Sequence, residues 1–161
     1  MSDPDSRTLA RQLGRPPRGR WRIVRRCSYG APVVIATAPA LGETPFPTLY
    51  YLTCPHLVAE VAAVESAGGC ERWRESLAAD SALVARLQNA DVTYREARAA
   101  EGGGQDAAAG VGIAGERDVL GVKCLHAHVA AHLAGIDDPI GESLIRDLKC
   151  ECSSDRCREA T

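Results

Sequence analysis

Residues 48–64, TLYYLTCPHLVAEVAAV, hold the point at which the sequence changes from a strand pattern to a helix pattern. The stretch from Thr48 to Thr53 is rich in aromatic and β-branched residues, which are typical of strands. After Pro55 the apolar residues recur at intervals of three and four, the period of a helix, until the Gly68-Gly69 pair stops them. This junction predicts a strand that leads directly into a helix.

Two stretches before this junction also have the composition of strands. Trp21 to Arg26 and Pro32 to Ala38 contain β-branched residues, and the turn sequence Ser28-Tyr29-Gly30 between them predicts a hairpin. Further upstream, apolar residues four apart predict a short helix from Pro4 to Leu13. Together the three strands predict a small antiparallel sheet near the N-terminus.

The rest of the chain is helical in pattern. Cys70 to Ala100 predicts one or two helices, and the Gly- and Ala-rich segment 101–115 predicts a flexible, exposed connection. An apolar stripe from Val122 to Ile136, and another after Pro139, predict two more helices. The predicted fold is α+β, a single domain over 1–161 with an N-terminal helix or arm (1–14) and a cysteine-rich tail (150–161).

Composition narrows the class of protein. Of the 161 residues, 45% are hydrophobic and 25% are charged, which excludes a fibrous repeat or wholesale disorder. The sequence has no apolar run long enough to cross a bilayer, and the segment from Met1 to Ala10 is unlike a signal peptide, so we expect a cytoplasmic protein. In that reducing compartment the seven cysteines are expected to be free for metal binding, redox chemistry or burial.

Positive charge is concentrated near the start of the chain. The segment from Arg7 to Arg26 holds eight arginines and no acidic residue. One interpretation is that this strip pairs with the chain's own acidic residues; another is that it binds a phosphate-rich partner such as nucleic acid. The candidate anion-binding side chains are Arg15, Arg18, Arg20 and Arg22.

The strongest local motif is Lys123-Cys124-Leu125-His126-Ala127-His128, which continues to His132. On a helix, Cys124, His128 and His132 would lie within about 80° of one another, whereas His126 would be exposed or engaged elsewhere. Thiolate and imidazole are ligands for zinc and iron, so these side chains are candidates for a metal site. The alternative is that Cys124 packs in the core and the histidines face solvent.

Other cysteines occur at predicted ends of strands and helices. Cys54 precedes the helix that begins at Pro55, and a helix N-terminus lowers the pKa of a thiol, so Cys54 is the best single candidate for a functional thiol. The alternative is a buried cysteine at the strand end. Cys27 lies in an analogous place after the first strand, and Cys70 begins a helix as a spare cysteine. The tail cysteines Cys150, Cys152 and Cys157 match no standard zinc-finger spacing, but we expect at least one of them to be a ligand.

Several segments of the sequence match those of a known family. They are Gln12-Leu13-Gly14-Arg15, Arg26-Cys27 with Gly30 and Pro32, Pro45 to Tyr50 leading to Leu52 to Pro55, Tyr94 with Arg98, Val122 to His128, and Pro139 to Gly141. From about Arg11 to Cys152 the chain resembles an uncharacterised, mainly actinobacterial family, domain of unknown function 501. It departs from the family at Ala114, where a glycine is usual. The resemblance implies no established activity, only a gene near cell-division and central-metabolism genes, hence a possible cell-division partner.

The resemblance also implies which of the seven cysteines act together as metal ligands. It implies that Cys27, Cys54, Cys124 and one tail cysteine, taken as Cys152, form a shared centre for zinc or an iron–sulfur cluster, with a structural or regulatory role. The alternative ligands or supporting groups are His126, His128, His132, Cys150 and Cys157.

Two other functions stay open. One is a metal-dependent enzyme, a hydrolase, dehydratase or redox enzyme, with an open site at Cys54, Cys124 and His128 and with His126 or Glu60 as a proton carrier. The other is a metal-free module that binds nucleic acid or an acidic division protein through the arginine strip.

Overall fold

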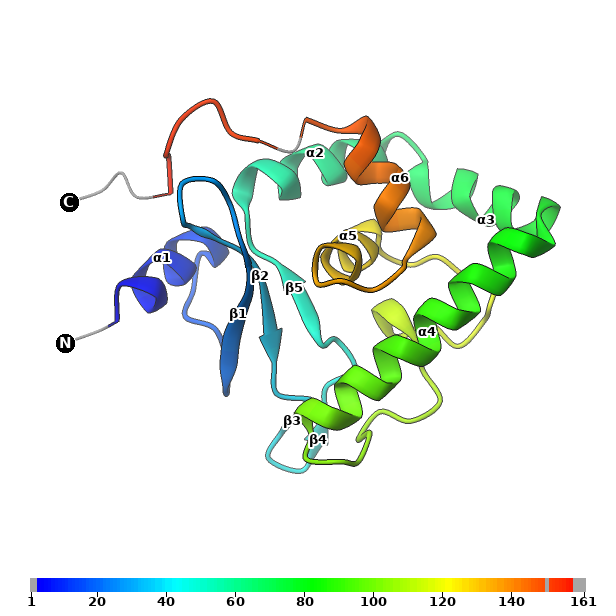
Figure 1. Cartoon of the computed structure of the whole chain (residues 1–161), viewed down its shortest axis with the longest axis horizontal. Helices are drawn as coiled ribbons and strands as arrows, with labels where there is room; N and C mark the ends of the chain where they lie inside the picture. The colour runs from blue at the N-terminus through cyan, green and yellow to red at the C-terminus, as the bar shows by residue number, and fades with distance from the viewer. Residues whose placement is uncertain (1–2, 150, 158–161) are drawn as a thin grey trace.

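The computed structural model describes residues 3–149 and 151–157 (Figure 1). Three strands near the N-terminus form a sheet, and most of the remaining chain is helical, so the predicted α+β class is confirmed. In chain order the elements are α1 (Pro4–Leu13), β1 (Trp21–Arg26), β2 (Pro32–Thr37), β3 (Ala40–Leu41), β4 (Thr44–Pro45), β5 (Tyr50–Leu52), α2 (Pro55–Ser66), α3 (Gly69–Ala79), α4 (Ser81–Glu101), the 3-10 turn η1 (Ile113–Gly115), α5 (Leu125–Leu133) and α6 (Pro139–Asp147).

The main sheet has the strand order β1-β2-β5, and both pairings are antiparallel. The predicted hairpin is confirmed, because β1 and β2 are joined by the tight turn that ends at Gly30, whose φ is 79°. All six residues of the central strand β2 are buried. The small ribbon β3-β4 lies between β2 and β5 in the sequence.

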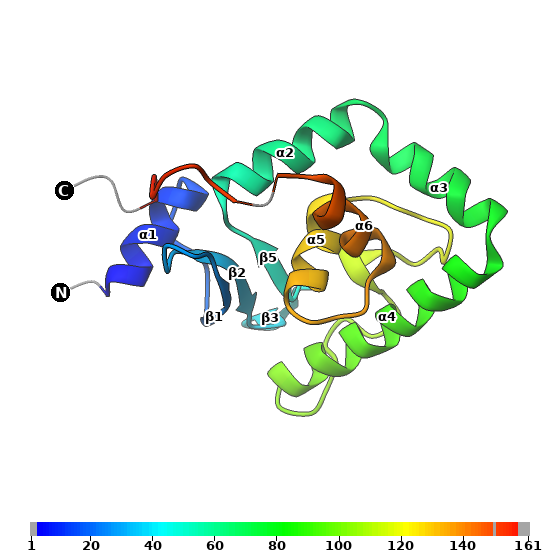
Figure 2. The ribbon, with the colours of Figure 1, turned by 45° about the horizontal axis from the view of Figure 1, so that its top comes forward.

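The two faces of the sheet have different neighbours. Side chains alternate along a strand, so Tyr50 and Leu52 point to one face and Tyr51 to the other. Tyr50 and Leu52 belong to the main hydrophobic core, and α5 packs against β5. Helix α1 packs against β2 and buries Leu9 completely. A turned view shows α1 on one side of the sheet and α5 on the other (Figure 2).

The helices α2, α3 and α4 follow one another around α5 and α6 (Figure 1). Helix α6 approaches α5 so closely that a Cβ at Gly141 would collide with the His128 carbonyl group. Asp138 caps α6 by accepting hydrogen bonds from the backbone N–H groups of Ile140 and Gly141, and α5 and α6 form a tight pair at the centre of the helical part.

Helix α4 holds the segment before β5 through two buried side chains one turn apart. The Leu49 N–H donates a hydrogen bond of 2.7 Å to Tyr94 Oη, and Arg98 Nη1 donates to the Pro47 carbonyl oxygen at 2.8 Å. Tyr94 and Arg98 are both fully buried. These two residues therefore have structural roles.

The connection after α4 is mostly exposed between residues 102 and 110, as predicted, but residues 111–113 are buried. Arg98 forms an ion pair with Asp106 and donates hydrogen bonds to the carbonyl oxygens of Ala108 and Val111, which folds this segment back onto α4. As a result Val111 and Ile113 are buried. The composition of this segment did not predict its buried part, because Val111 and Ile113 are only two apolar residues among many small ones.

Candidate metal centre

Three side chains with metal-ligating atoms meet where the end of α2 faces the start of α5. Glu65 lies in the last turn of α2, Cys124 immediately precedes α5, and His126 lies in its first turn. The ligand atoms of these three residues all lie within 4.8 Å of one another. Within residues 3–149 and 151–157 this is the one group of three or more such side chains that meets this distance.

Cys124 reaches this position because it is not helical. Its φ of −152° and ψ of 111° are extended, and α5 begins at the next residue. The helical angles that grouped Cys124 with His128 and His132 therefore do not apply, and that part of the sequence prediction is wrong. The extended backbone instead places Cys124 Sγ 3.9 Å from His126 Nδ1.

The hydrogen bonds around His126 assign its two ring nitrogens. Nε2 lies 3.0 Å from the Val58 carbonyl oxygen, which can only accept, so Nε2 carries a proton and donates it. Nδ1 then faces Glu65 Oε1 at 3.2 Å and the Cys124 thiol. The same Glu65 oxygen accepts a 2.7 Å hydrogen bond from the Leu125 N–H, which fixes the carboxylate relative to α5.

The donor set suits zinc. Thiolate, imidazole and carboxylate are the side chains that bind zinc in proteins, and a histidine ligand usually donates its second ring N–H to a carbonyl or carboxylate. His126 does this through Val58. The side chains of His126 and Glu65 are 24% and 28% exposed, so the group is accessible from solvent. Three protein ligands with an open side leave a coordination position for water or another molecule.

The electrostatic environment favours a protonated His126 when no metal is bound. Its hydrogen bond with Cys124, followed by the Val58 carbonyl and the Glu65 carboxylate, raises the pKa of His126 to about 9 against the opposing effect of burial. Cys70 lies beside the group: burial, followed by the neighbouring Glu65, raises the pKa of its thiol.

This raised pKa predicts a pH dependence of stability for the metal-free protein. The pKa of His126 is about 9 in the folded chain and has a usual value of 6.5. The stabilisation is therefore complete below about pH 6.5 and is lost as the pH rises through 9. We expect the melting temperature to fall between pH 7 and 9.5 in the wild type and to fall less in His126→Gln. Equal pH profiles for the two proteins would contradict this assignment.

A second group of thiols lines a different cavity, which we call the thiol cavity. Cys27, Cys54 and Cys152 all line a cavity of about 160 Å³, together with Tyr29 and Leu57. The cysteines come from the end of β1, the N-terminus of α2 and the tail, as the sequence predicted for their positions along the chain. Burial raises the pKa of Cys152, and so does the neighbouring Cys54.

The structure thus divides the four cysteines that the sequence analysis grouped together. Cys27, Cys54 and Cys152 share the thiol cavity, whereas Cys124 lies with Glu65 and His126. Of the alternative ligands, Cys157 accepts a hydrogen bond from Gln12 Nε2, and Cys150 lies outside the described residues.

The remaining histidines of the motif lie apart from both groups. His128 is buried, and its Nδ1 lies 2.7 Å from Asp138 Oδ2, so it joins α5 to the cap of α6. His132 is half-buried near the end of α5, beside the acidic residues Asp137 and Glu142. The structure therefore does not bring Cys54, Cys124 and His128 together as an open site.

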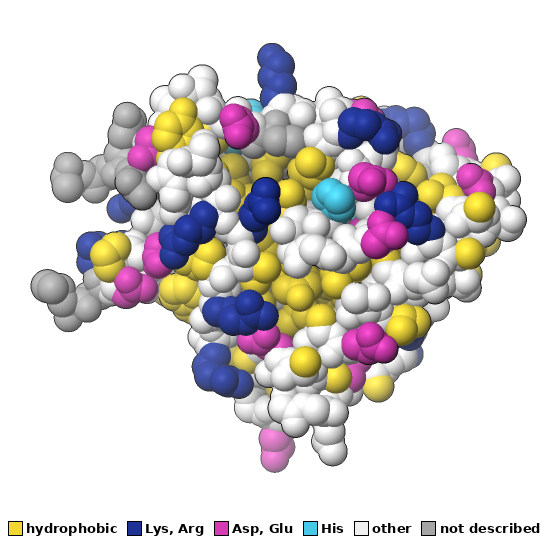
Figure 3. Space-filling view, viewed as in Figure 1, with side chains coloured by type: hydrophobic (Ala, Val, Ile, Leu, Met, Phe, Trp, Pro, Cys, Tyr) yellow, Lys and Arg dark blue, Asp and Glu magenta, His cyan; other side chains and the backbone are white. Residues whose placement is uncertain are grey.

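The arginine strip has mixed surroundings. Basic side chains gather over β1 on the face shown in Figure 3. Arg22 forms an ion pair with Glu101, and Arg26 forms one with Asp5, in line with the interpretation that the strip pairs with the chain's own acidic residues. Arg15 and Arg18 instead line a pocket beside Tyr51.

Comparison with known proteins places the chain in a family. The family model described as "Protein of unknown function (DUF501)" matches residues 23–146. The chain belongs to this family. No curated protein and no solved structure matches the chain.

The matched region contains all three residues of the candidate metal centre and also Cys27 and Cys54, whereas Cys152 lies beyond it. Arg15 and Arg18 precede the matched region. Within the described part of the chain, no helix combines the length and the apolar composition needed to cross a membrane.

Sequence reasoning did not select Glu65. A single glutamate near the end of an amphipathic helix has no distinguishing pattern, and its partners lie about 60 positions away along the chain. The Cys-x-His spacing of Cys124 and His126 was the available signal, but it could be used only if α5 was known to start after Cys124.

Proposed function

We propose that this protein binds a zinc ion through Glu65, Cys124 and His126, with one coordination position open to water or to a substrate group. The observation that carries the proposal is the combination of three ligand atoms within 4.8 Å of one another and a second His126 nitrogen that donates to Val58. That combination orients the ring so that Nδ1 faces the other ligands.

Zinc is favoured over hard cations by the chemistry of the ligands. Magnesium and calcium prefer oxygen ligands, whereas this group supplies one sulfur, one nitrogen and one carboxylate oxygen. A zinc ion with three protein ligands polarises a bound carbonyl group or lowers the pKa of bound water. The class of chemistry that the centre supports best is therefore metal-assisted hydrolysis.

Cys70 decides whether the site is open or closed. Burial raises the pKa of its thiol, as do the charges of the nearby Glu65 and Cys124, but Cys70 is not one of the three side chains whose ligand atoms lie within 4.8 Å of one another. It becomes a fourth protein ligand only if it moves toward the metal. A site closed by Cys70 would be structural, and a site without it would be catalytic. Cobalt substitution separates the two cases, because a second thiolate, from Cys70, intensifies the sulfur-to-cobalt charge-transfer band in the near ultraviolet.

The test is a metal titration of protein purified anaerobically and stripped with a chelator. We expect zinc to bind at Glu65, Cys124 and His126, and we expect Cys70→Ser to keep the affinity and the cobalt spectrum of the wild type. A fully folded wild type that binds no zinc would overturn the proposal. Loss of zinc binding in Cys70→Ser would overturn the open coordination position and assign a closed site.

A second candidate metal site is the thiol cavity. Three cysteines from separate segments line it, and Cys54 lies close enough to Cys152 to raise its pKa. Thiols become good ligands only when a soft cation replaces their protons, as zinc or an iron–sulfur cluster does. A metal ion or cluster in the thiol cavity would link the tail to the β1-β2 hairpin and to α2.

If the thiol cavity binds a metal, substitutions of its cysteines should remove that metal without affecting zinc at Glu65, Cys124 and His126. In the double variant Cys27→Ser/Cys54→Ser we expect the iron, or a second equivalent of zinc, to disappear while zinc at Glu65, Cys124 and His126 is retained. Elemental analysis and an absorption spectrum of anaerobically purified protein measure both quantities. An unchanged metal content in the double variant would remove the thiol cavity as a metal site.

A further inference from the structure

A pocket lies on the face of the sheet opposite to α5. Tyr51 and its partner across the sheet, Ile35, both line it, and their alternation with Tyr50 and Leu52 turns them away from the main core. The segment that follows α1 forms another wall through Leu13, Arg15, Pro17 and Arg18. This pocket contains none of the residues of the two candidate metal sites.

One side of the pocket is aromatic and apolar. The rings of Phe46 and Tyr51 are stacked, with centroids 6.0 Å apart and an angle of 19° between their planes. Both rings are only half-buried, so the stack is accessible from the pocket. Leu13, Ile35 and Leu41 complete the apolar lining. A nearly parallel pair of rings beside an apolar wall is a surface on which a flat ligand ring can pack.

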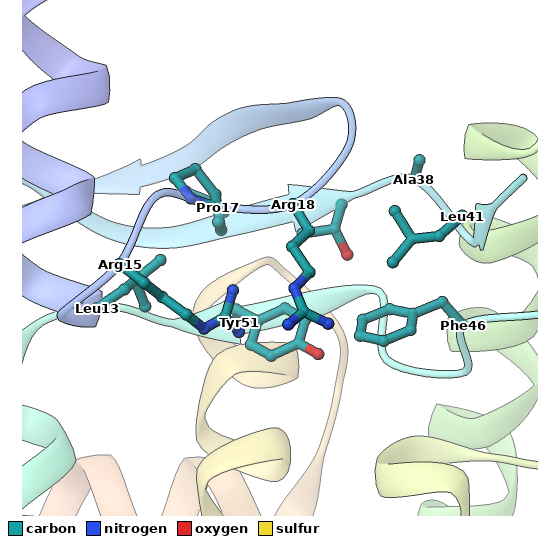
Figure 4. A pocket seen from close by; sticks show the side chains of 10 residues that line it. Leu13, Arg15, Pro17, Arg18, Ala38, Leu41, Phe46 and Tyr51 are labelled. Atoms are coloured by element: carbon teal, nitrogen blue, oxygen red, sulfur yellow. The ribbon is translucent and has the colours of Figure 1, made fainter.

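Two arginines lie over this aromatic surface. Arg15 and Arg18 both extend toward the Tyr51 ring, with Phe46 beside it (Figure 4). Both are exposed, and Arg15 makes one long hydrogen bond, of 3.4 Å, to the Pro16 carbonyl oxygen. Among the residues that the structure describes, no carboxylate forms an ion pair with either of them, in contrast to Arg22 and Arg26, which are paired.

The backbone between the two arginines is restricted. Helix α1 ends at Leu13 and is capped by Gly14, which has a φ of 70°, and prolines 16 and 17 separate Arg15 from Arg18. Each proline fixes its own φ near −65° and restricts the residue before it to an extended backbone. Two guanidinium groups on such a restricted segment can bind one anion with a smaller loss of conformational entropy than those on a flexible arm.

The size of the pocket limits the ligand. Its cavity volume is about 70 Å³, and it is open to solvent on one side. That space holds a single ring, and an anionic group attached to the ring would lie at the open side, near the exposed Arg15 and Arg18. We propose that this pocket binds a small molecule with one planar ring and one phosphate or carboxylate group. The ring packs against Phe46 and Tyr51, and Arg15 and Arg18 bind the anion.

Phenyl phosphate is a suitable probe, compared with inorganic phosphate and benzyl alcohol. Binding is measured by NMR titration of zinc-free full-length protein, so that the phosphate cannot bind a metal and the result is independent of the zinc proposal. We expect phenyl phosphate to bind about tenfold or more tightly than inorganic phosphate or benzyl alcohol. It alone has both a ring to pack against Phe46 and Tyr51 and an anionic group for Arg15 and Arg18.

Three variants test the assignment. Arg15→Gln/Arg18→Gln should weaken phenyl phosphate binding about tenfold or more. Tyr51→Leu should weaken phenyl phosphate binding but leave inorganic phosphate binding unchanged. The matched control Arg25→Gln/Arg117→Gln removes the same charge from two exposed arginines outside the pocket and should retain wild-type affinity.

The proposal is overturned if phenyl phosphate binds no better than inorganic phosphate. It is also overturned if the control pair loses as much affinity as Arg15→Gln/Arg18→Gln, because binding would then reflect overall charge. Circular dichroism of each variant confirms that the fold is retained. A carboxylate probe, benzoate, tested in the same series then shows which anion the pocket prefers.

Discussion

Replacing Arg98 with methionine is expected to lower the free energy of unfolding by about 3–5 kcal/mol. Arg98 is completely buried, and it pairs with Asp106 while donating to the carbonyl oxygens of Pro47, Ala108 and Val111. The substitution leaves a carboxylate and several carbonyl groups without their donor, and such unpaired groups are costly when they are buried. Urea denaturation followed by circular dichroism measures the loss.

An exposed arginine provides the matched control for this prediction. Arg146 lies beside Asp147 with both side chains largely exposed, so Arg146→Met should change the free energy of unfolding by about 0.5 kcal/mol or less. We also expect Arg98→Lys to be strongly destabilising, because one ammonium group cannot replace the planar guanidinium at several acceptors. A loss at Arg98 no larger than that at Arg146 would show that the segment after α4 does not depend on this side chain.

Replacing Cys124 with serine is expected to lower the affinity for zinc by about 100-fold or more, because the thiolate supplies the strongest of the proposed ligand bonds. Glu65→Gln should have a smaller effect, about tenfold, since the amide oxygen can still coordinate weakly. Competition with a chromophoric chelator measures both constants. His132→Gln, which lies on α5 with His126 but outside the group, should keep the wild-type affinity. Equal affinities in Cys124→Ser and His132→Gln would exclude Cys124 as a ligand.

The parts of the fold that local patterns determine were predicted from the sequence. The change of period at Pro55 correctly placed the junction between β5 and α2, because a strand and a helix have different repeats. The turn at Ser28-Tyr29-Gly30 correctly predicted the hairpin. In both places the pattern lies within a few residues, so no knowledge of distant contacts was needed.

The candidate metal centre could be predicted only in part. The sequence identified Cys124 and His126 as residues with ligand chemistry, but it placed them on opposite sides of one helix. The start of α5 at Leu125 leaves Cys124 extended and brings both side chains toward Glu65. That arrangement depends on the packing of α2 against α5, which joins segments about 60 residues apart and leaves no periodic signal in either of them.

The tests of the two candidate metal sites and of the pocket lined by Arg15, Arg18 and Tyr51 are independent of one another. Zinc binding at Glu65, Cys124 and His126 does not require the thiol cavity, and neither metal site includes Arg15 or Arg18. Each variant series therefore reports on one site.

The most direct measurement is an anomalous difference map at the zinc absorption edge, from crystals of the full chain grown with zinc. We predict a peak at about 2.0–2.3 Å from Cys124 Sγ, His126 Nδ1 and a Glu65 carboxylate oxygen. A well-ordered structure with no peak between these three atoms, or with zinc only in the cavity of Cys27, Cys54 and Cys152, would contradict the proposed centre.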